Sequence, residues 1–191
     1  MLKKTKLKVS LPTIIFFCAL FFLGNSVISY IPFLCALLHE LGHIVAMNLF
    51  GIKIYEIKIL PFGIDIKKEI CITSYKTDII IGSAGILTNL LLIICSIFLP
   101  QNNITQFFIL SNILLILINV LPIKTLDGGQ MLEKFLSMKF DIQTAENIVS
   151  VLSFICIILL GSVAIWLLLY SGYNFTLFLI CVYLFCGIFI K

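Results

Sequence analysis

The chain has little charge, no arginine and only two histidines. Of its 191 residues, 12% are charged and 61% are hydrophobic, and the mean hydropathy is +1.20. These values lie outside the range of soluble globular domains. All 13 basic residues are lysines, and the net charge is +4. Because the lysines lie in short segments between long apolar runs, this charge indicates contact with lipid headgroups, not binding to nucleic acid.

The cysteines argue against a zinc site built on thiolates. There are seven of them, an odd number, and no two stand in a Cys-x-x-Cys pair. Most lie within apolar runs, where a thiol behaves as a small hydrophobic group. We therefore expect packing roles for the cysteines.

Apolar runs of roughly 20 residues recur along the chain, which is the length needed to cross about 30 Å of hydrocarbon. The lysines of segment 3–8 before the first run resemble the start of a signal peptide, but no small-x-small cleavage site follows. The sequence predicts an all-α polytopic membrane protein with about six transmembrane helices. The predicted spans are about 10–24, 27–50, 79–100, 104–123, 148–170 and 174–190.

The distribution of lysines predicts the orientation of these spans. All lysines fall in segments 3–8, 53–76 and 124–139 or at Lys191, whereas the other three loops carry no charge. With an even number of spans, every basic segment lies on one side, and the positive-inside rule makes that side cytoplasmic. We expect both termini in the cytoplasm.

The most informative motif is His39-Glu40-Leu41-Gly42-His43, within the second predicted span. Residues four apart lie on one face of a helix, so both histidines can present a ring nitrogen to one metal ion. Glu40 can then deprotonate a metal-bound water. The alternative is a pair of core histidines, which is uncommon for ionisable groups within a membrane. The motif favours a zinc hydrolase.

A catalytic zinc ion usually has three protein ligands and keeps the fourth position for water. Of nine acidic residues, only Glu40 and Asp127 lie outside the bulk of the polar loops. Asp127 follows the fourth predicted span, where Pro122 breaks the helix and Gly128-Gly129 permits close backbone approach. It is a candidate third ligand. The alternative is an ordinary helix-to-loop turn with a solvated aspartate cap.

Segment 52–73 alternates isoleucines with charged residues around a Pro61-Phe62-Gly63 turn, which predicts an interfacial β-hairpin. Its free edge could pair with an extended peptide. Alternatively, the hairpin only seats the protein at the headgroups. The spans within 148–190 contain no charged residue and are interpreted as scaffold.

Together these motifs resemble the site-2 protease family of intramembrane zinc metalloproteases, and most of all its stage IV sporulation protein FB branch. The resemblance covers roughly residues 30–135. It rests on the histidine motif, on Asn119-x-x-Pro122 followed by Asp127-Gly128-Gly129, and on two shorter segments, 51–63 and 83–89. Ile86 and Lys124-Thr125 stand where the family often has proline.

The resemblance implies that His39, His43 and Asp127 bind Zn²⁺, that Glu40 is the general base, and that Asn119 lies near the developing oxyanion. It implies a zinc metalloendopeptidase of one membrane domain, 1–191, comprising the histidine-motif helix 27–50, the hairpin 51–78, the segment 119–130 and the scaffold spans 148–190. We expect the nucleotide-binding CBS domain of the sporulation branch to be absent.

The implied substrate is a membrane-anchored protein, a sporulation pro-sigma factor being one candidate, cut near the cytoplasmic face of a bacterial cytoplasmic or forespore membrane. Inhibitory membrane proteins are further candidate partners. The alternative from another functional class is a non-proteolytic zinc-binding protein or transporter. A transporter would need ion ligands spread along a path, often in repeats, and the sequence has neither.

Overall fold

The computed structural model describes residues 6–9, 13, 27–60, 63–68, 73–171 and 175–189. The predicted first span, about 10–24, and the tip of the hairpin fall almost wholly outside these residues. The described chain forms two units, the first ending at Ile116 and the second beginning at Leu117. Each is considered by itself.

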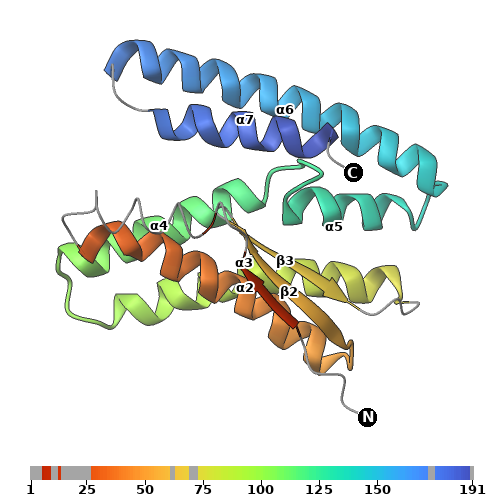
Figure 1. Cartoon of the computed structure of the whole chain (residues 1–191), viewed down its shortest axis with the longest axis horizontal. Coiled ribbons are helices and arrows are strands. Elements are labelled where there is room, and N and C mark those ends of the chain that lie inside the picture. Colours follow the sequence, from red (N-terminus) through yellow and green to blue (C-terminus); the bar gives the residue numbers. More distant parts are fainter. Residues whose placement is uncertain are drawn as a thin grey trace. The chain divides into compact units, whose positions relative to one another are not determined.

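The first unit is built on two antiparallel helices, α2 (Ile31–Leu49) and α3 (Tyr75–Ile97), which lie side by side in Figure 1. A short 3-10 turn, η1 (Val27–Tyr30), precedes α2. Pro32 lies in the first turn of α2, where no intrahelical donor is needed. α2 ends at Leu49, and Gly51 two residues later has a φ of +69°, which is readily adopted only by glycine. Ser74 caps α3 by accepting a hydrogen bond from the Thr77 backbone N–H.

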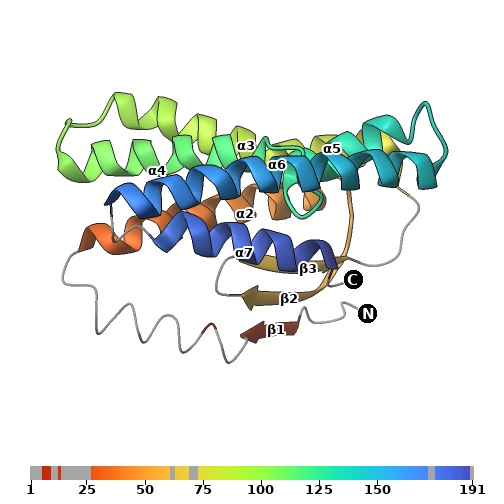
Figure 2. The same cartoon turned by 90° about the horizontal axis from the view of Figure 1, so that it is seen from above.

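A three-stranded sheet belongs to the same unit, in the order β1 (Lys6–Val9), β2 (Ile54–Leu60), β3 (Gly63–Lys68) (Figure 2). The antiparallel β2–β3 pair confirms the predicted hairpin. The parallel strand β1 was not expected, because its lysines had been interpreted only as a cytoplasmic flank. Lys8 pairs with Glu56 of β2 at 3.2 Å, and this long-range ion pair is invisible to local sequence patterns.

Helix α4 (Asn103–Asn119) begins in the first unit and contacts α2 through polar side chains. The Asn112 amide donates hydrogen bonds to the Cys35 thiol (3.2 Å) and to the Phe108 carbonyl (2.9 Å). Asn112 is completely buried. These two bonds satisfy the NH₂ group of a buried amide, as a membrane-spanning bundle requires.

The second unit contains α5 (Asp127–Leu136), α6 (Ile142–Ser171) and α7 (Phe175–Phe189), with α6 and α7 packed side by side (Figure 1). Asp141 precedes α6 and accepts a hydrogen bond from the Thr144 backbone N–H at 3.1 Å. Hydrogen bonds from the Thr144 hydroxyl and backbone lower the pKa of Asp141. The core of this unit is a cluster of Ile123, Ile157 and Leu184.

Apolar helices occupy five of the six predicted spans, and the chain is an integral membrane protein. Within the described residues, three helical stretches are long and apolar enough to cross a bilayer, Ile28–Leu49, Tyr75–Ile97 and Ile142–Ser171, and two shorter ones, Asn103–Asn119 and Leu177–Gly187, are also apolar. Large side chains on their outer faces are exposed, as expected of lipid-facing surfaces. On α2 these are Leu34, Leu37, Leu41, Val45 and Leu49.

Candidate metal centre

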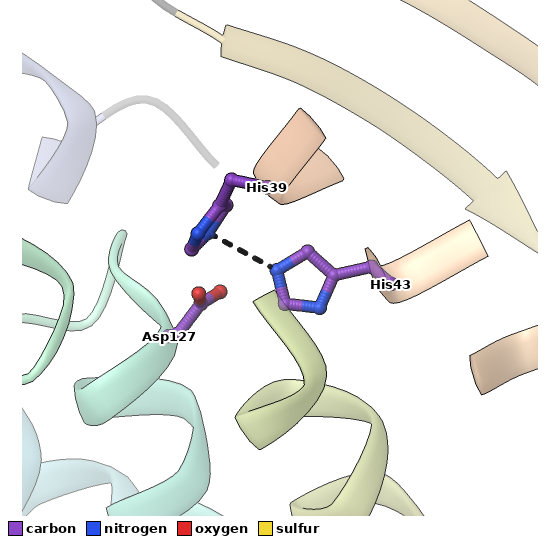
Figure 3. Close-up of side chains that lie close together, drawn as sticks. All are labelled: His39, His43 and Asp127. Carbon is purple, nitrogen blue, oxygen red and sulfur yellow. Dashed lines mark hydrogen bonds between the residues drawn. The ribbon is translucent and has the colours of Figure 1, made fainter. Parts of the chain in front are cut away.

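The two histidines of the motif lie on the buried face of α2. His39 and His43 are 4% and 8% exposed, among a buried row that also contains Cys35 and Ala46. Their Nε2 atoms are 3.3 Å apart, joined by the dashed line in Figure 3. Two nitrogens at about 2.0–2.1 Å from a tetrahedral zinc ion would themselves be about 3.3–3.4 Å apart. The pair therefore has the spacing that one zinc ion requires.

Helix α3 orients His43 through a backbone carbonyl. The Nδ1 of His43 lies 2.8 Å from the Ile81 carbonyl oxygen. Because a carbonyl only accepts, Nδ1 carries the proton and donates it, which leaves the lone pair of the neutral ring on Nε2. A hydrogen bond from the second ring nitrogen is the usual way in which a protein fixes a metal-ligating histidine.

The Nδ1 of His39 faces the side-chain Nδ2 of Asn89, which donates, whereas the Ile81 carbonyl accepts. These two nitrogens of His39 and Asn89 are 3.1 Å apart, and Asn89 is completely buried. Ile81, Gly85 and Asn89 are spaced by four along α3 and form its buried row, so one face of α3 contacts both imidazole rings.

Gly85 lies between these two contacts, directly beneath the rings. A Cβ atom built there would stand 2.5 Å from Nε2 of His43 and 2.6 Å from Nε2 of His39. Glycine thus keeps clear the space on which both Nε2 atoms converge. The burial, the ring orientations and this open cradle all fit Zn²⁺.

Gly42 sets the separation of the two helices. A Cβ at this position would lie 2.2 Å from the Thr88 hydroxyl and 2.9 Å from the Ala84 carbonyl of α3. Absence of a side chain at Gly42 lets α2 approach α3 closely enough for its histidines to reach Ile81 and Asn89.

Glu40 follows His39 on α2 and is partly buried.

Asp127 and Asn119 belong to the other predicted motif. Asn119 is the last residue of α4, and the following turn passes through Pro122 before α5 begins at Asp127, whose carboxylate is drawn in Figure 3. The helix therefore ends just before the proline, as predicted.

Both glycines after Asp127 are required by close backbone approach. A Cβ at Gly128 would lie 2.4 Å from the Val120 carbonyl oxygen, and one at Gly129 would lie 2.1 Å from that of Ile123. The first turn of α5 is thus seated directly on the preceding turn, so that Asp127 has a defined position within its unit.

Ser153 of α6 fixes the same turn from the other side. Its hydroxyl is completely buried, accepts a hydrogen bond from the Lys124 backbone N–H at 2.8 Å, and lies 2.6 Å from the Val149 carbonyl. The Lys124 ammonium forms an ion pair with Glu146, also on α6. Helix α6, interpreted from the sequence as scaffold, therefore supports the turn that carries Asp127.

Sequence reasoning found the histidines but assigned no role to Ile81, Gly85 or Asn89. Gly85 and Asn89 lie in segment 83–89, which was noted only for its resemblance. The four-residue spacing of Ile81, Gly85 and Asn89, matching that of His39 and His43, was the available indication of a shared face.

Comparison with known proteins supports the same interpretation. Residues 100–160, which contain the Asn119-to-Asp127 segment, match the model of peptidase family M50. A zinc metalloprotease of Methanocaldococcus jannaschii is 28% identical over 169 residues, which are 84% of this chain and 47% of the relative. Stage IV sporulation protein FB of Bacillus subtilis is 28% identical over 121 residues, 60% of this chain and 42% of the relative.

The chain thus spans less than half the length of these two curated relatives. The solved site-2 protease of Methanocaldococcus jannaschii has a similar structure, with a TM-score of 0.64 and 25% identity, covering 95% of this chain and 88% of that one. The histidine pair, the family match and this structural similarity agree, and the chain resembles the site-2 proteases of peptidase family M50.

Proposed function

We propose that the protein is an intramembrane zinc endopeptidase that cleaves a membrane-anchored protein near the cytoplasmic face. The observation that carries the proposal is the pair of buried Nε2 atoms, 3.3 Å apart, within an apolar helix long enough to span a membrane. Ionisable groups at such depth cost about 2.5–3.5 kcal/mol each on insertion scales and are retained chiefly for function.

In this proposal His39, His43 and Asp127 are the three protein ligands. Two imidazoles and one carboxylate form a donor set typical of catalytic zinc, with the fourth position available to water. Zinc, when bound, lowers the pKa of a water ligand to about 7 and polarises the scissile carbonyl. Asp127 is supported by its place in the family motif and by the glycines and Ser153 that hold its turn.

The remaining chemistry belongs to Glu40 and Asn119. Glu40 accepts the proton of the attacking water and returns it to the leaving amine, a contribution typically worth 10²–10⁴-fold in rate. Asn119 donates a side-chain N–H to the carbonyl oxygen as negative charge develops there. The substrate must be locally unwound, because an α-helix hides its amides in internal hydrogen bonds.

The finer parts of the proposal concern substrate and orientation. The uncharged loops and the lysine-bearing segments support a cytoplasmic location for both termini. Similarity to a sporulation protein supports a membrane-associated pro-sigma factor as the first substrate to test, in a bacterial cytoplasmic or forespore membrane. Inhibitory membrane proteins would act by covering the site.

The deciding experiment is Glu40→Gln in full-length protein, co-expressed with candidate membrane-tethered substrates. The side chain keeps its size but loses the proton acceptor. Zinc content should stay near one ion per chain while cleavage falls at least about 10²-fold. Asp127→Ala is the converse control, because it should lose zinc and cleavage together.

A zinc transporter or storage protein would respond differently. Its zinc binding and zinc flux into vesicles would be insensitive to Glu40→Gln, and no substrate would be cut by either form. Cleavage at the wild-type rate by a zinc-loaded Glu40→Gln protein would refute the mechanism.

A further inference from the structure

We infer that Asn89 is a positioning residue for zinc, which sets the tautomer of His39 by presenting its amide oxygen to Nδ1. This inference rests on the proposed zinc site. It concerns a residue of α3 that belongs neither to the histidine motif nor to the proposed chemistry.

The starting point is a requirement of imidazole chemistry. A neutral histidine has one N–H and one lone pair, so ligation through Nε2 places the proton on Nδ1. That N–H is buried with the rest of His39 and needs an acceptor. The side-chain amide of Asn89 lies at hydrogen-bond distance from Nδ1, with Nδ2 at 3.1 Å.

The two ends of the Asn89 amide have unequal surroundings. Its Nδ2 faces Nδ1 of His39, which suits a ring whose proton is on Nε2, while its Oδ1 is buried with no hydrogen-bond partner. The NH₂ group and the oxygen are nearly equal in size, so rotation by 180° exchanges them without a packing cost. In the rotated amide Oδ1 accepts from Nδ1–H, and the NH₂ group takes the buried place in which Oδ1 has no hydrogen-bond partner.

The two histidines are therefore held by different devices. His43 faces the Ile81 backbone carbonyl, which can only accept and so always favours the Nδ1–H form. His39 faces an amide that can either donate or accept. The backbone of α3 thus fixes His43 in the tautomer that binds zinc through Nε2. His39 adopts that tautomer only when Asn89 turns its amide oxygen toward Nδ1.

Alternatives to this role are limited by burial. Asn89 is 0% exposed, so its amide is not retained for contact with water or headgroups. A buried amide oxygen without a partner costs free energy, because it has lost its hydrogen bonds to water.

The test compares the zinc affinities of Asn89→Leu, Asn89→Asp and Asn112→Leu. Full-length protein in detergent is used with zinc alone as the ligand, and affinity is measured by competition with a chelator. Asn112 is the matched control, because it is also completely buried, lies in an apolar helix and has an unpartnered Oδ1, but contacts Cys35 instead of a histidine.

Loss of an outer hydrogen-bond partner typically weakens metal binding 10–100-fold, and we expect this for Asn89→Leu. Asn89→Asp, whose carboxylate only accepts, should bind zinc within about threefold of wild type or more tightly. Asn112→Leu should bind as the wild type does. If Asn89→Leu matches Asn112→Leu, or Asn89→Asp weakens binding tenfold or more, the inference is wrong.

A spectroscopic measurement keeps the test informative if Asn89→Leu does not fold. The chain has only two histidines, so their ¹⁵N resonances in zinc-free protein are readily separated. Asn89→Asp should move His39 toward the Nδ1–H tautomer and leave His43 unchanged, and an unchanged His39 would overturn the inference. Failure of the wild type to bind zinc would instead refute the proposed function, and the inference with it.

Discussion

Gly85→Ala should abolish tight zinc binding, although it adds a single methyl group. The new Cβ would lie 2.5 Å from Nε2 of His43 and 2.6 Å from both Cε1 and Nε2 of His39, whereas ordinary contacts begin at 3.4 Å. The methyl group would also occupy the space on which both nitrogens converge. Neither ring can move away without lengthening its hydrogen bond to Ile81 or Asn89.

The magnitude follows from these two effects. Overpacking by a methyl group typically costs about 1–3 kcal/mol, and a lost hydrogen bond adds about 1 kcal/mol. In the zinc-bound state the rings cannot relax, so about 2–4 kcal/mol should be lost from binding. That corresponds to roughly 30- to 1000-fold weaker zinc affinity.

The assay is chelator competition on full-length protein in detergent. Gly161→Ala is the control, because Gly161 lies in α6 and a Cβ there would meet nothing within 4 Å. Both substitutions raise helix propensity equally. If Gly85→Ala binds zinc as tightly as Gly161→Ala, then the space beneath the rings is not the metal position, and the geometry argued above is wrong.

Gly129→Ala should lower cleavage and zinc affinity at least about tenfold, because its Cβ would lie 2.1 Å from the Ile123 carbonyl oxygen and would displace the start of α5. Wild-type cleavage and wild-type zinc affinity would show that Asp127 needs no such support. A reporter fused near Gln101, in an uncharged loop, should lie on the side opposite the cytoplasm. Reporter activity characteristic of the cytoplasm at Gln101 would refute the six-span orientation.

The sequence alone was sufficient for several features of this protein. The four-residue spacing of His39 and His43 dictates a common helix face, and the structure confirms their converging nitrogens. Pro122 cannot continue a helix, and α4 ends just before it. The hairpin was predictable because alternation and a turn are local properties.

What only the tertiary structure decided lies between elements distant in the sequence. Local patterns could not pair β1 with β2, nor show that segment 83–89 holds the histidine rings through Gly85 and Asn89. These contacts depend on how closely α2 and α3 approach, which Gly42 sets by having no side chain. Spacing within one helix identifies His39 and His43 as candidate metal ligands, but their tautomers and the space between them are determined by the helix packed against them.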